Sequence, residues 1–236
     1  MELNRKYFNQ RKWHFDELPL TIMIETAMAC NLRCEMCPVP KSTETMDGRK
    51  PSIMSFDIYN KILHQLSQQK RIIYLNQMGE PLLNKHICEF VSIAKKYNHS
   101  VFITTNGTLM NTRLAKELLT AGLDGITFSV DGFSPDTYER IRIGANYESV
   151  RNNIESFCDL KKLYNKGTWV QIDCILSDLT KNEIPLMQKY WKISNKFHPA
   201  NIIHWHYQPM EKYMVWEKIK MVFWGRTRAS ILLGNL

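Results

Sequence analysis

The sequence lacks a long apolar run. No segment approaches the roughly 18 consecutive apolar residues of a membrane span. Residues 1–15 are basic and aromatic and contain no apolar stretch of the kind found in secretory signals. We therefore expect no transmembrane segment and a cytoplasmic location, where cysteine thiols stay reduced.

The sequence also contains no low-complexity segment and no near-identical repeat. Its composition is 44% hydrophobic, 23% charged and 11% aromatic, which is ordinary for a globular protein. At 236 residues, the chain is long enough for one sizeable domain or two small ones.

Acidic residues are outnumbered by basic ones, and the formal net charge is +8. This excess permits an anionic partner such as a nucleotide, a nucleic acid or a membrane surface. The basic residues are dispersed along the chain, so a solvated basic surface is the favoured interpretation and a nucleic-acid partner is not favoured.

Cysteine is scarce, but half of the six cysteines fall within one short segment. Cys30, Cys34 and Cys37 lie within eight residues, in CNLRCEMC. The others are scattered at apolar positions of expected helices or strands, where small core residues are expected; they are Cys88, Cys158 and Cys174. A tight cluster of reduced thiols indicates metal or redox chemistry rather than disulfide bonds.

Strand-like and helix-like segments alternate along the chain. Apolar, β-branched segments predict strands at 20–26, 71–77, 100–107, 125–132, 168–177 and 201–207. Segments with helical spacing predict helices at 56–66, 84–98, 111–122, 134–142, 147–164 and 182–194. We expect Ser55 to cap the first helix, Gly122 to close the third, and Pro185 to interrupt the last. The first strand is expected to be buried.

This alternation predicts parallel strands with right-handed crossovers. An open doubly wound sheet and a complete or partial β/α barrel both satisfy it, and both carry their chemistry after the carboxyl ends of the strands. The unusual segments follow the first four strands in turn, at 30–37, 78–81, 105–107 and 129–132. We expect them to meet at one rim of the sheet.

Three cysteines leave a metal site incomplete. A structural zinc site normally has four protein ligands, and the fourth would have to come from His86, His99, His204 or His206. A [4Fe–4S] cluster held by three thiolates instead keeps one iron without a protein ligand. An open metal position is typical of reactive sites, so three thiols favour a reactive cluster.

The motif Cys-x3-Cys-x2-Cys after the first strand resembles the signature of the radical S-adenosylmethionine (radical SAM) superfamily. QMGEPLLN (77–84), TTNGTLM (104–110) and FSVDG (128–132) with TYERIR (137–142) resemble further segments of its SPASM-associated, peptide-modifying branch. The resemblance covers about residues 20–208. It implies an α/β fold, a partial (β/α)6 radical SAM barrel of parallel strands with outer helices.

The resemblance also implies the cofactors. Cys30, Cys34 and Cys37 would hold one [4Fe–4S] cluster, and the amino and carboxylate groups of SAM would chelate its open iron. An electron from the cluster would then cleave SAM to a 5′-deoxyadenosyl radical that abstracts a substrate hydrogen. The electron would come from an external flavodoxin- or ferredoxin-like donor.

Four positions would contact SAM near the first two strands. Met36 stands where relatives usually have a hydrophobic or aromatic residue near adenine. Gly79, Glu80 and Pro81 match the segment that receives the methionyl ammonium, although Met78 replaces the usual first glycine. A glycine at a strand end lets backbone carbonyls approach such a group closely.

Four more positions would complete the SAM site. The resemblance places Asn106 near the ribose or the substrate. Ser129 and Asp131 share one face of the fourth strand, with Ser129 facing SAM, and Arg142 would bind the SAM carboxylate bidentately.

The residues alone leave plainer roles open. Glu80 could be a turn residue, Asn106 part of a simple turn, Asp131 a cap, and Arg142 a surface or ion-paired arginine.

The resemblance predicts three regions: a basic N-terminal extension (1–19), a radical SAM core (20–208) and a helical C-terminal tail (209–236). A truncated extension is the alternative interpretation of the tail. No cysteine follows Cys174, so the auxiliary clusters of SPASM relatives are not expected. The leading hypothesis is a radical SAM enzyme acting on a peptide or small-metabolite substrate. The alternatives are an RNA-modifying radical SAM enzyme and an inactive cluster- or zinc-binding module.

Overall fold

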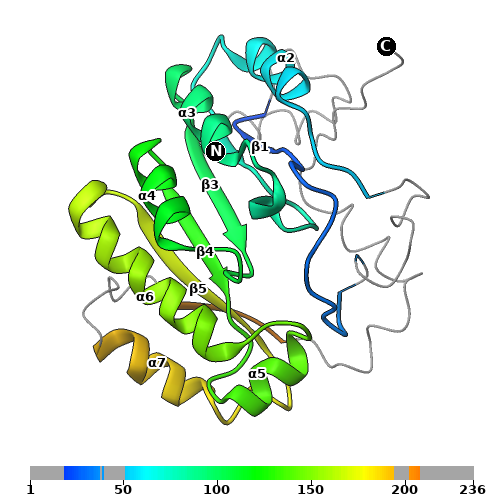
Figure 1. Cartoon of the computed structure of the whole chain (residues 1–236), viewed down its shortest axis with the longest axis vertical. Coiled ribbons are helices and arrows are strands. Elements are labelled where there is room, and N and C mark those ends of the chain that lie inside the picture. The colour runs from blue at the N-terminus through cyan, green and yellow to red at the C-terminus, as the bar shows by residue number, and fades with distance from the viewer. Residues whose placement is uncertain (1–18, 38, 40–50, 194–201, 208–236) are drawn as a thin grey trace, which may run out of the picture.

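Six parallel strands form one sheet in the computed structural model, which describes residues 19–37, 39, 51–193 and 202–207 (Figure 1). Their spatial order, β1-β2-β3-β4-β5-β6, follows the chain, and every neighbouring pair is parallel. The strands are β1 (Thr21–Met23), β2 (Ile72–Tyr74), β3 (Ser100–Thr105), β4 (Gly125–Ser129), β5 (Trp169–Leu176) and β6 (Ile202–Tyr207).

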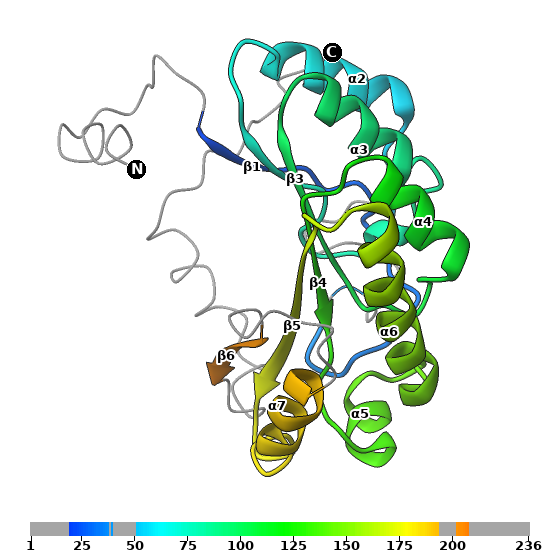
Figure 2. The same cartoon turned by 90° about the vertical axis from the view of Figure 1, so that its left-hand side faces the viewer.

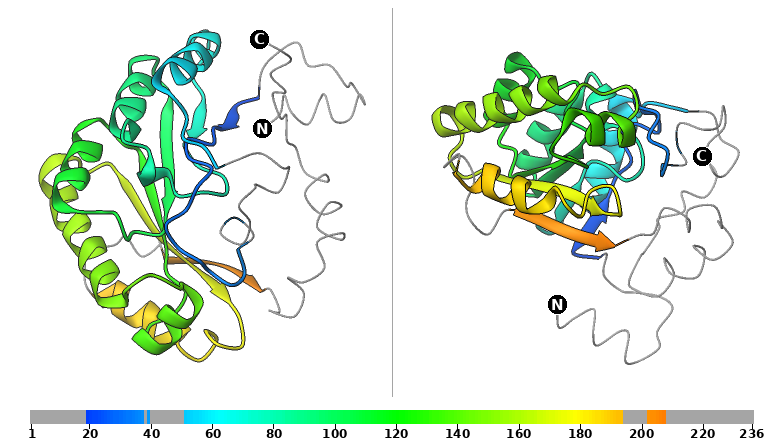
Figure 3. Two further views of the ribbon diagram at one scale, coloured as in Figure 1. Left: turned by 45° about the vertical axis from the view of Figure 1, so that its right-hand side comes forward. Right: turned by 90° about the horizontal axis from the view of Figure 1, so that it is seen from below.

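The helices between the strands cover one face of the sheet (Figure 2). They are α2 (Phe56–Leu66), the short 3-10 helix η2 (Pro81–Leu83), α3 (Ile87–Lys96), α4 (Thr112–Thr120), α5 (Pro135–Ile141), α6 (Tyr147–Tyr164) and α7 (Ile184–Ile193). A doubly wound sheet reverses its strand order and carries helices on both faces. Sequential order and one-sided helices instead confirm a partial (β/α)6 barrel, whose curved sheet is visible in Figure 3.

Local signals set several helix ends. The Ser55 hydroxyl accepts a hydrogen bond from Ile58 N, which caps α2 as predicted. Gly122 follows the end of α4 with a φ of +90°, a left-handed conformation that favours glycine, so its predicted closing role is confirmed.

One local prediction is wrong. Pro185 does not interrupt the last helix, because α7 begins at Ile184 and the proline falls in its first turn. A first-turn N–H has no intrahelical acceptor, so proline costs nothing there. The predicted regions 1–19 and 209–236 lie outside the described residues, except for Pro19.

The two faces of the sheet differ in burial. Residues directed toward the helices form the core, and Phe128 meets Phe157 of α6 edge to face. The opposite, inner face is partly exposed: β3 alternates between half-buried and buried positions, and Met23 of β1 is 44% exposed. The prediction that the first strand is buried is therefore correct for its helix-facing side only.

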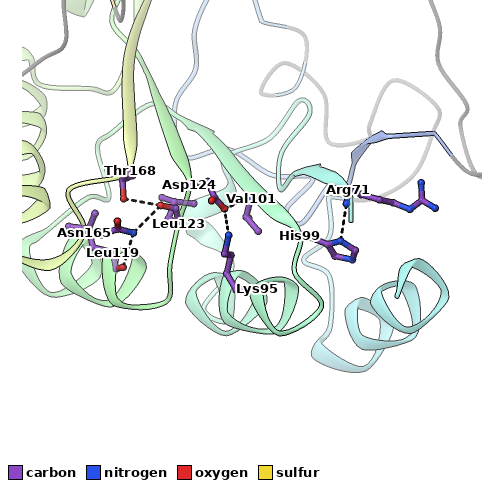
Figure 4. Close-up of polar contacts among 9 residues, drawn as sticks. All are labelled: Arg71, Lys95, His99, Val101, Leu119, Leu123, Asp124, Asn165 and Thr168. Carbon is purple, nitrogen blue, oxygen red and sulfur yellow. Dashed lines mark hydrogen bonds and ion pairs between the residues drawn. The ribbon is translucent and has the colours of Figure 1, made fainter. Parts of the chain in front are cut away.

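The amino-terminal ends of the strands form a lower edge joined by polar contacts (Figure 4). Asp124 accepts hydrogen bonds from Lys95 Nζ (2.6 Å) and Val101 N (2.8 Å). The Nδ1 atom of His99 accepts from Arg71 N (3.1 Å). These contacts tie helix ends to strand starts. None of the helices in the described part of the chain has the length and apolarity needed to cross a membrane.

Candidate active site

The three clustered cysteines lie in the loop that follows β1, at the carboxyl-terminal rim of the sheet. Cys34 is buried, whereas Cys30 and Cys37 are partly exposed. Backbone N–H groups support the loop: Leu32 N donates to Cys30 Sγ (3.4 Å), and Cys37 N donates to the Cys34 carbonyl (3.0 Å). The thiols are thus held on one short, hydrogen-bonded turn.

The thiols share one electrostatic environment. Burial raises the pKa of Cys30, and the nearby Glu80 and Cys37 raise it further. Burial also raises the pKa of Cys34, while the Arg142 guanidinium opposes this increase. A thiol must lose its proton to bind iron or zinc. Arg142 therefore provides positive charge where thiolates would form.

The segment after β2 packs tightly against the cysteine loop. A Cβ atom on Gly79 would lie 1.9 Å from the Ala27 carbonyl oxygen, so only glycine fits. The Glu25 carboxylate accepts hydrogen bonds from Met78 N (2.8 Å) and Gly79 N (3.1 Å). Sequence analysis missed Glu25, although an acidic residue within an otherwise apolar strand segment was a usable signal.

Glu80 is 2% exposed, and protein donors occupy its carboxylate. It accepts hydrogen bonds from Thr105 Oγ1 (2.6 Å), Asn106 N (2.8 Å) and Leu82 N (3.0 Å). Burial raises the pKa of Glu80, and these hydrogen bonds partly offset the increase. Glu80 therefore joins the loop that follows β2 to the loop that follows β3, and Pro81 is buried beside it.

Asn106 connects the β3 loop to the cysteine loop. Its Nδ2 atom lies 3.8 Å from Cys30 Sγ and donates to Asn31 Oδ1 at 3.0 Å. Its Oδ1 atom accepts from Thr108 N (2.9 Å), and Asn31 Nδ2 donates to Thr108 Oγ1 (2.8 Å). Asn106 thus serves both as a turn residue and as a neighbour of the thiols. Asn31 carried no motif signal and was missed.

Arg142 is paired with Asp131 below the cysteine loop. Its Nε and Nη2 atoms lie 2.7 and 2.6 Å from Asp131 Oδ2, and Asp131 Oδ1 accepts from Ile175 N at 2.6 Å. Burial alone would lower the pKa of Arg142, but the Asp131 carboxylate outweighs it, so the pKa is raised. Asp131 is fully buried with both oxygens bonded, so it acts by positioning Arg142.

The remaining predicted site residues also lie at the rim. Met36 is partly exposed between Cys34 and Cys37, and Ser129 is partly exposed at the end of β4. The hydroxyl of Ser129 has no hydrogen-bond partner among the residues that the structure describes. Every predicted cluster and SAM residue therefore falls at the carboxyl end of β4, in the segments after β1 to β4, or at Arg142, which caps the end of α5.

The predicted zinc alternative depended on a histidine. His86 contacts Glu89, and His99 lies at the lower edge, away from the thiols. The side chains of His204 and His206 lie outside the described part. Within the described ranges, no three His, Cys, Asp or Glu side chains lie close enough to bind a single metal ion. Three thiols on one turn fit a cluster, in which each thiolate binds a different iron.

The chain matches the model of a known family. The family model described as the Radical SAM superfamily matches residues 24–176, the interval from the end of β1 through β5.

Curated proteins similar to the chain include a cyclase and a cofactor-modifying protein. A probable GTP 3′,8-cyclase from Methanococcus maripaludis (strain C5) is 31% identical over 163 residues, which are 68% of this chain and 51% of that protein. The chain thus spans about half the length of this relative. A cofactor-modifying protein for the tungsten-containing aldehyde ferredoxin oxidoreductase of Pyrococcus furiosus is 34% identical, over 47% of this chain and 30% of that protein.

Among solved structures, SuiB from Streptococcus suis bound to S-adenosylmethionine has the same fold. It aligns with a TM-score of 0.62 and 16% identity, over 83% of this chain and 42% of SuiB. SuiB has also been solved bound to its precursor peptide SuiA.

Proposed function

The chain belongs to the radical SAM superfamily, and we propose that it abstracts a hydrogen atom from a peptide or small-metabolite substrate. Members of the superfamily are enzymes that use a [4Fe–4S] cluster and SAM. The observation that carries the proposal is the convergence on one rim of three thiols, the Asn106 amide and the Arg142 guanidinium, whose side chain is 15% exposed.

The residues fit these cofactors. Cys30, Cys34 and Cys37 would hold one cluster, with one iron left open for SAM. When bound and reduced, the cluster supplies the electron that cleaves SAM to a hydrogen-abstracting radical. The remaining cysteines do not form a second triplet, since Cys158 and Cys174 are separately buried in the core.

The predicted SAM residues divide into two roles. We assign direct contact to Met36, Gly79, Asn106, Ser129 and Arg142, which are partly exposed, present backbone groups or adjoin the thiols. Glu80, Pro81 and Asp131 are buried, so they position these contacts: Glu80 fixes Asn106 N, and Asp131 orients the guanidinium. A guanidinium with one edge held by a carboxylate keeps other N–H groups for a second anion.

Two similar proteins support the substrate class. One curated relative is named as a probable GTP 3′,8-cyclase, and the structural neighbour SuiB has been solved bound to a precursor peptide. We therefore retain a peptide or small molecule as the substrate, and an external flavodoxin- or ferredoxin-like donor as the reductant. RNA modification rests on net charge alone, and no contact in the described residues favours it.

The test is reductive cleavage of SAM. The chain is reconstituted anaerobically with iron and sulfide, then given dithionite and SAM, and 5′-deoxyadenosine is measured by chromatography. We expect the product from the wild type and from Cys88→Ala, a cysteine on α3 that contacts Glu117 of α4, but not from Cys34→Ala. Equal product from Cys34→Ala and wild type would overturn the proposal.

A further inference from the structure

The inner face of the sheet is layered beneath the rim. One of its layers is aromatic: Tyr74 stacks on Phe102 with ring centroids 5.3 Å apart, and the positions of Phe102 and Trp169 leave no room for a Cβ at Gly125. These contacts fix which side chains point inward, because alternate residues of a strand share a face. Phe128, one position out of phase, contacts α6 on the other side.

Above the aromatic layer lies a set of polar side chains that we call the polar belt. The register pairs Thr104 with Thr127, Thr127 with Gln171, and Ser129 with Asp173, so these side chains lie on one inner surface. The belt is Thr104, Thr127, Ser129, Gln171 and Asp173.

The polar belt has unused hydrogen-bonding capacity. Gln171 donates to Asp173, and this is the only hydrogen bond that the structure gives to any belt side chain within the described residues. Thr127 is 9% exposed and Gln171 is 8% exposed, yet the Thr127 hydroxyl and the Gln171 carbonyl oxygen have no partner in the described part. Neither oxygen is among the fully buried unpaired atoms of the described residues, so both reach the space at the inner face and can accept or donate a hydrogen bond to a ligand there.

The charges at the inward positions of β1 to β5 indicate the ligand class; the side chains of β6 lie outside the described residues. The inward positions of β1 to β5 include no lysine, arginine or histidine; they are Thr21, Met23, Ile72, Tyr74, Ser100, Phe102, Thr104, Gly125, Thr127, Ser129, Trp169, Gln171, Asp173 and Ile175. Their one charged side chain is Asp173. A triphosphate requires cationic or metal partners, whereas a carboxylate beside an amide and hydroxyls matches a protonated amine or a guanidinium.

The geometry points to a substrate that carries a protonated amino group or a guanidinium group. This cation would bind the Asp173 carboxylate, and polar groups of the substrate beside the cation would bind the other side chains of the polar belt. This inference rests on the proposed function and names its substrate class. Asp173 pairs in register with Ser129, the residue assigned to SAM, so the substrate cation would lie next to the SAM site. This preference for a cationic substrate differs from the preference for an anion that is expected of an enzyme for a nucleoside triphosphate.

The test measures binding with defined probes. Five blocked peptides, acetyl-Gly-Xaa-Gly-amide with Xaa as Lys, Arg, Gln, Leu or Glu, are pooled with GTP. They are equilibrated by dialysis with the reconstituted, SAM-loaded chain, and bound and free amounts are compared by mass spectrometry. Because the peptides differ in one side chain only, the ratio of bound to free peptide shows how binding depends on the charge of that side chain.

We expect the Lys and Arg peptides to be enriched about tenfold over the Gln peptide, the size of one charged hydrogen bond. Asp173→Asn, which keeps the side-chain shape, should remove the enrichment. Asp178→Asn is the matched control, since Asp178 is exposed and pairs with Lys181 at the surface. No enrichment, enrichment of GTP or of the Glu peptide, or enrichment that persists in Asp173→Asn would overturn the inference.

The same preparations are assayed for 5′-deoxyadenosine, which separates this inference from the proposed function. SAM cleavage without enrichment of the Lys and Arg peptides would overturn the inferred substrate class and leave the proposed function standing. Cation enrichment that depends on Asp173, without SAM cleavage, supports the polar belt and counts against the proposed reaction.

Discussion

The carboxylates of Asp124 and Asp131 lie at opposite ends of the sheet, and each accepts hydrogen bonds from one cationic side chain and from one backbone N–H group. At the lower edge, Asp124 accepts from the Lys95 ammonium and from Val101 N; at the rim, Asp131 accepts from the Arg142 guanidinium and from Ile175 N. The lower pair is about one-third exposed, whereas the Asp131 side chain is 1% exposed and lies close to Cys34.

The difference supports the proposal that the rim, and not the lower edge, carries the chemistry. Hydrogen bonds of the lower edge join helices to strands within the fold (Figure 4). A buried ion pair costs desolvation and adds little stability over apolar packing. Its presence at the rim, beside the thiols and a serine hydroxyl without a partner among the described residues, is what the proposed SAM site would require.

The largest expected effect comes from Gly79→Ala. The added Cβ would lie 1.9 Å from the Ala27 carbonyl oxygen, and backbone on both sides prevents relaxation. We expect a loss of about 3 kcal/mol or more in the free energy of unfolding, measured by urea denaturation.

Gly167→Ala is the matched control for this change. Gly167 lies near the lower edge, and a Cβ there would meet only Asn165 Oδ1, at an ordinary 3.4 Å. The same substitution should leave stability unchanged or raise it by about 0.5 kcal/mol. Similar losses in the two variants would contradict the close packing of the rim segments.

The two matched carboxylates give the next prediction. Asp131→Asn leaves the buried guanidinium of Arg142 without its counter-charge, so we expect a loss of about 3 kcal/mol and weaker SAM binding. Asp124→Asn removes a partly solvated pair and should cost about 1 kcal/mol or less, with SAM binding unchanged. Calorimetric titration of SAM and urea midpoints provide both readouts; equal SAM affinities in the two variants would refute the positioning role of Asp131.

The smallest predicted effect is a pH dependence at the lower edge. Burial lowers the pKa of His99, and the charges of Arg71 and Lys95 lower it further. The folded state thus favours neutral His99, so its contribution to stability is complete above the unfolded pKa of about 6.5 and is lost as pH falls toward the lower folded value.

His99→Asn should reduce this pH dependence. The urea midpoint of the wild type should decrease between about pH 7.5 and about pH 5.5 more than that of the variant, and SAM affinity should be the same for both. A variant with an unchanged pH profile would show that His99 is not the responsible group.

The sequence predicted the sheet well because local patterns carry that information. The spacing of Ile58 and Ile62, with Ser55 before them, defined α2, and the strand–helix alternation defined a parallel sheet. The placement of the thiols and of the Gly79 segment at one rim follows from that topology. Pro185 was misjudged because proline breaks a helix only beyond its first turn.

The pairings within the site were not predictable from spacing. Asp131 meets Arg142 and Ile175, and Glu80 meets Asn106, through contacts between distant elements. Sequence analysis therefore identified Glu80 and Asp131 as site residues but could not show that protein donors occupy both carboxylates. Asp173 was missed for the same reason, since its importance depends on the strands beside it.

The central claim is that Cys30, Cys34 and Cys37 hold a single cluster. The most direct measurement is the iron content of the anaerobically reconstituted chain. The account predicts about four irons per chain, lost in the variant that replaces all three cysteines with alanine. Eight or more irons, or zinc bound in place of iron, would contradict it.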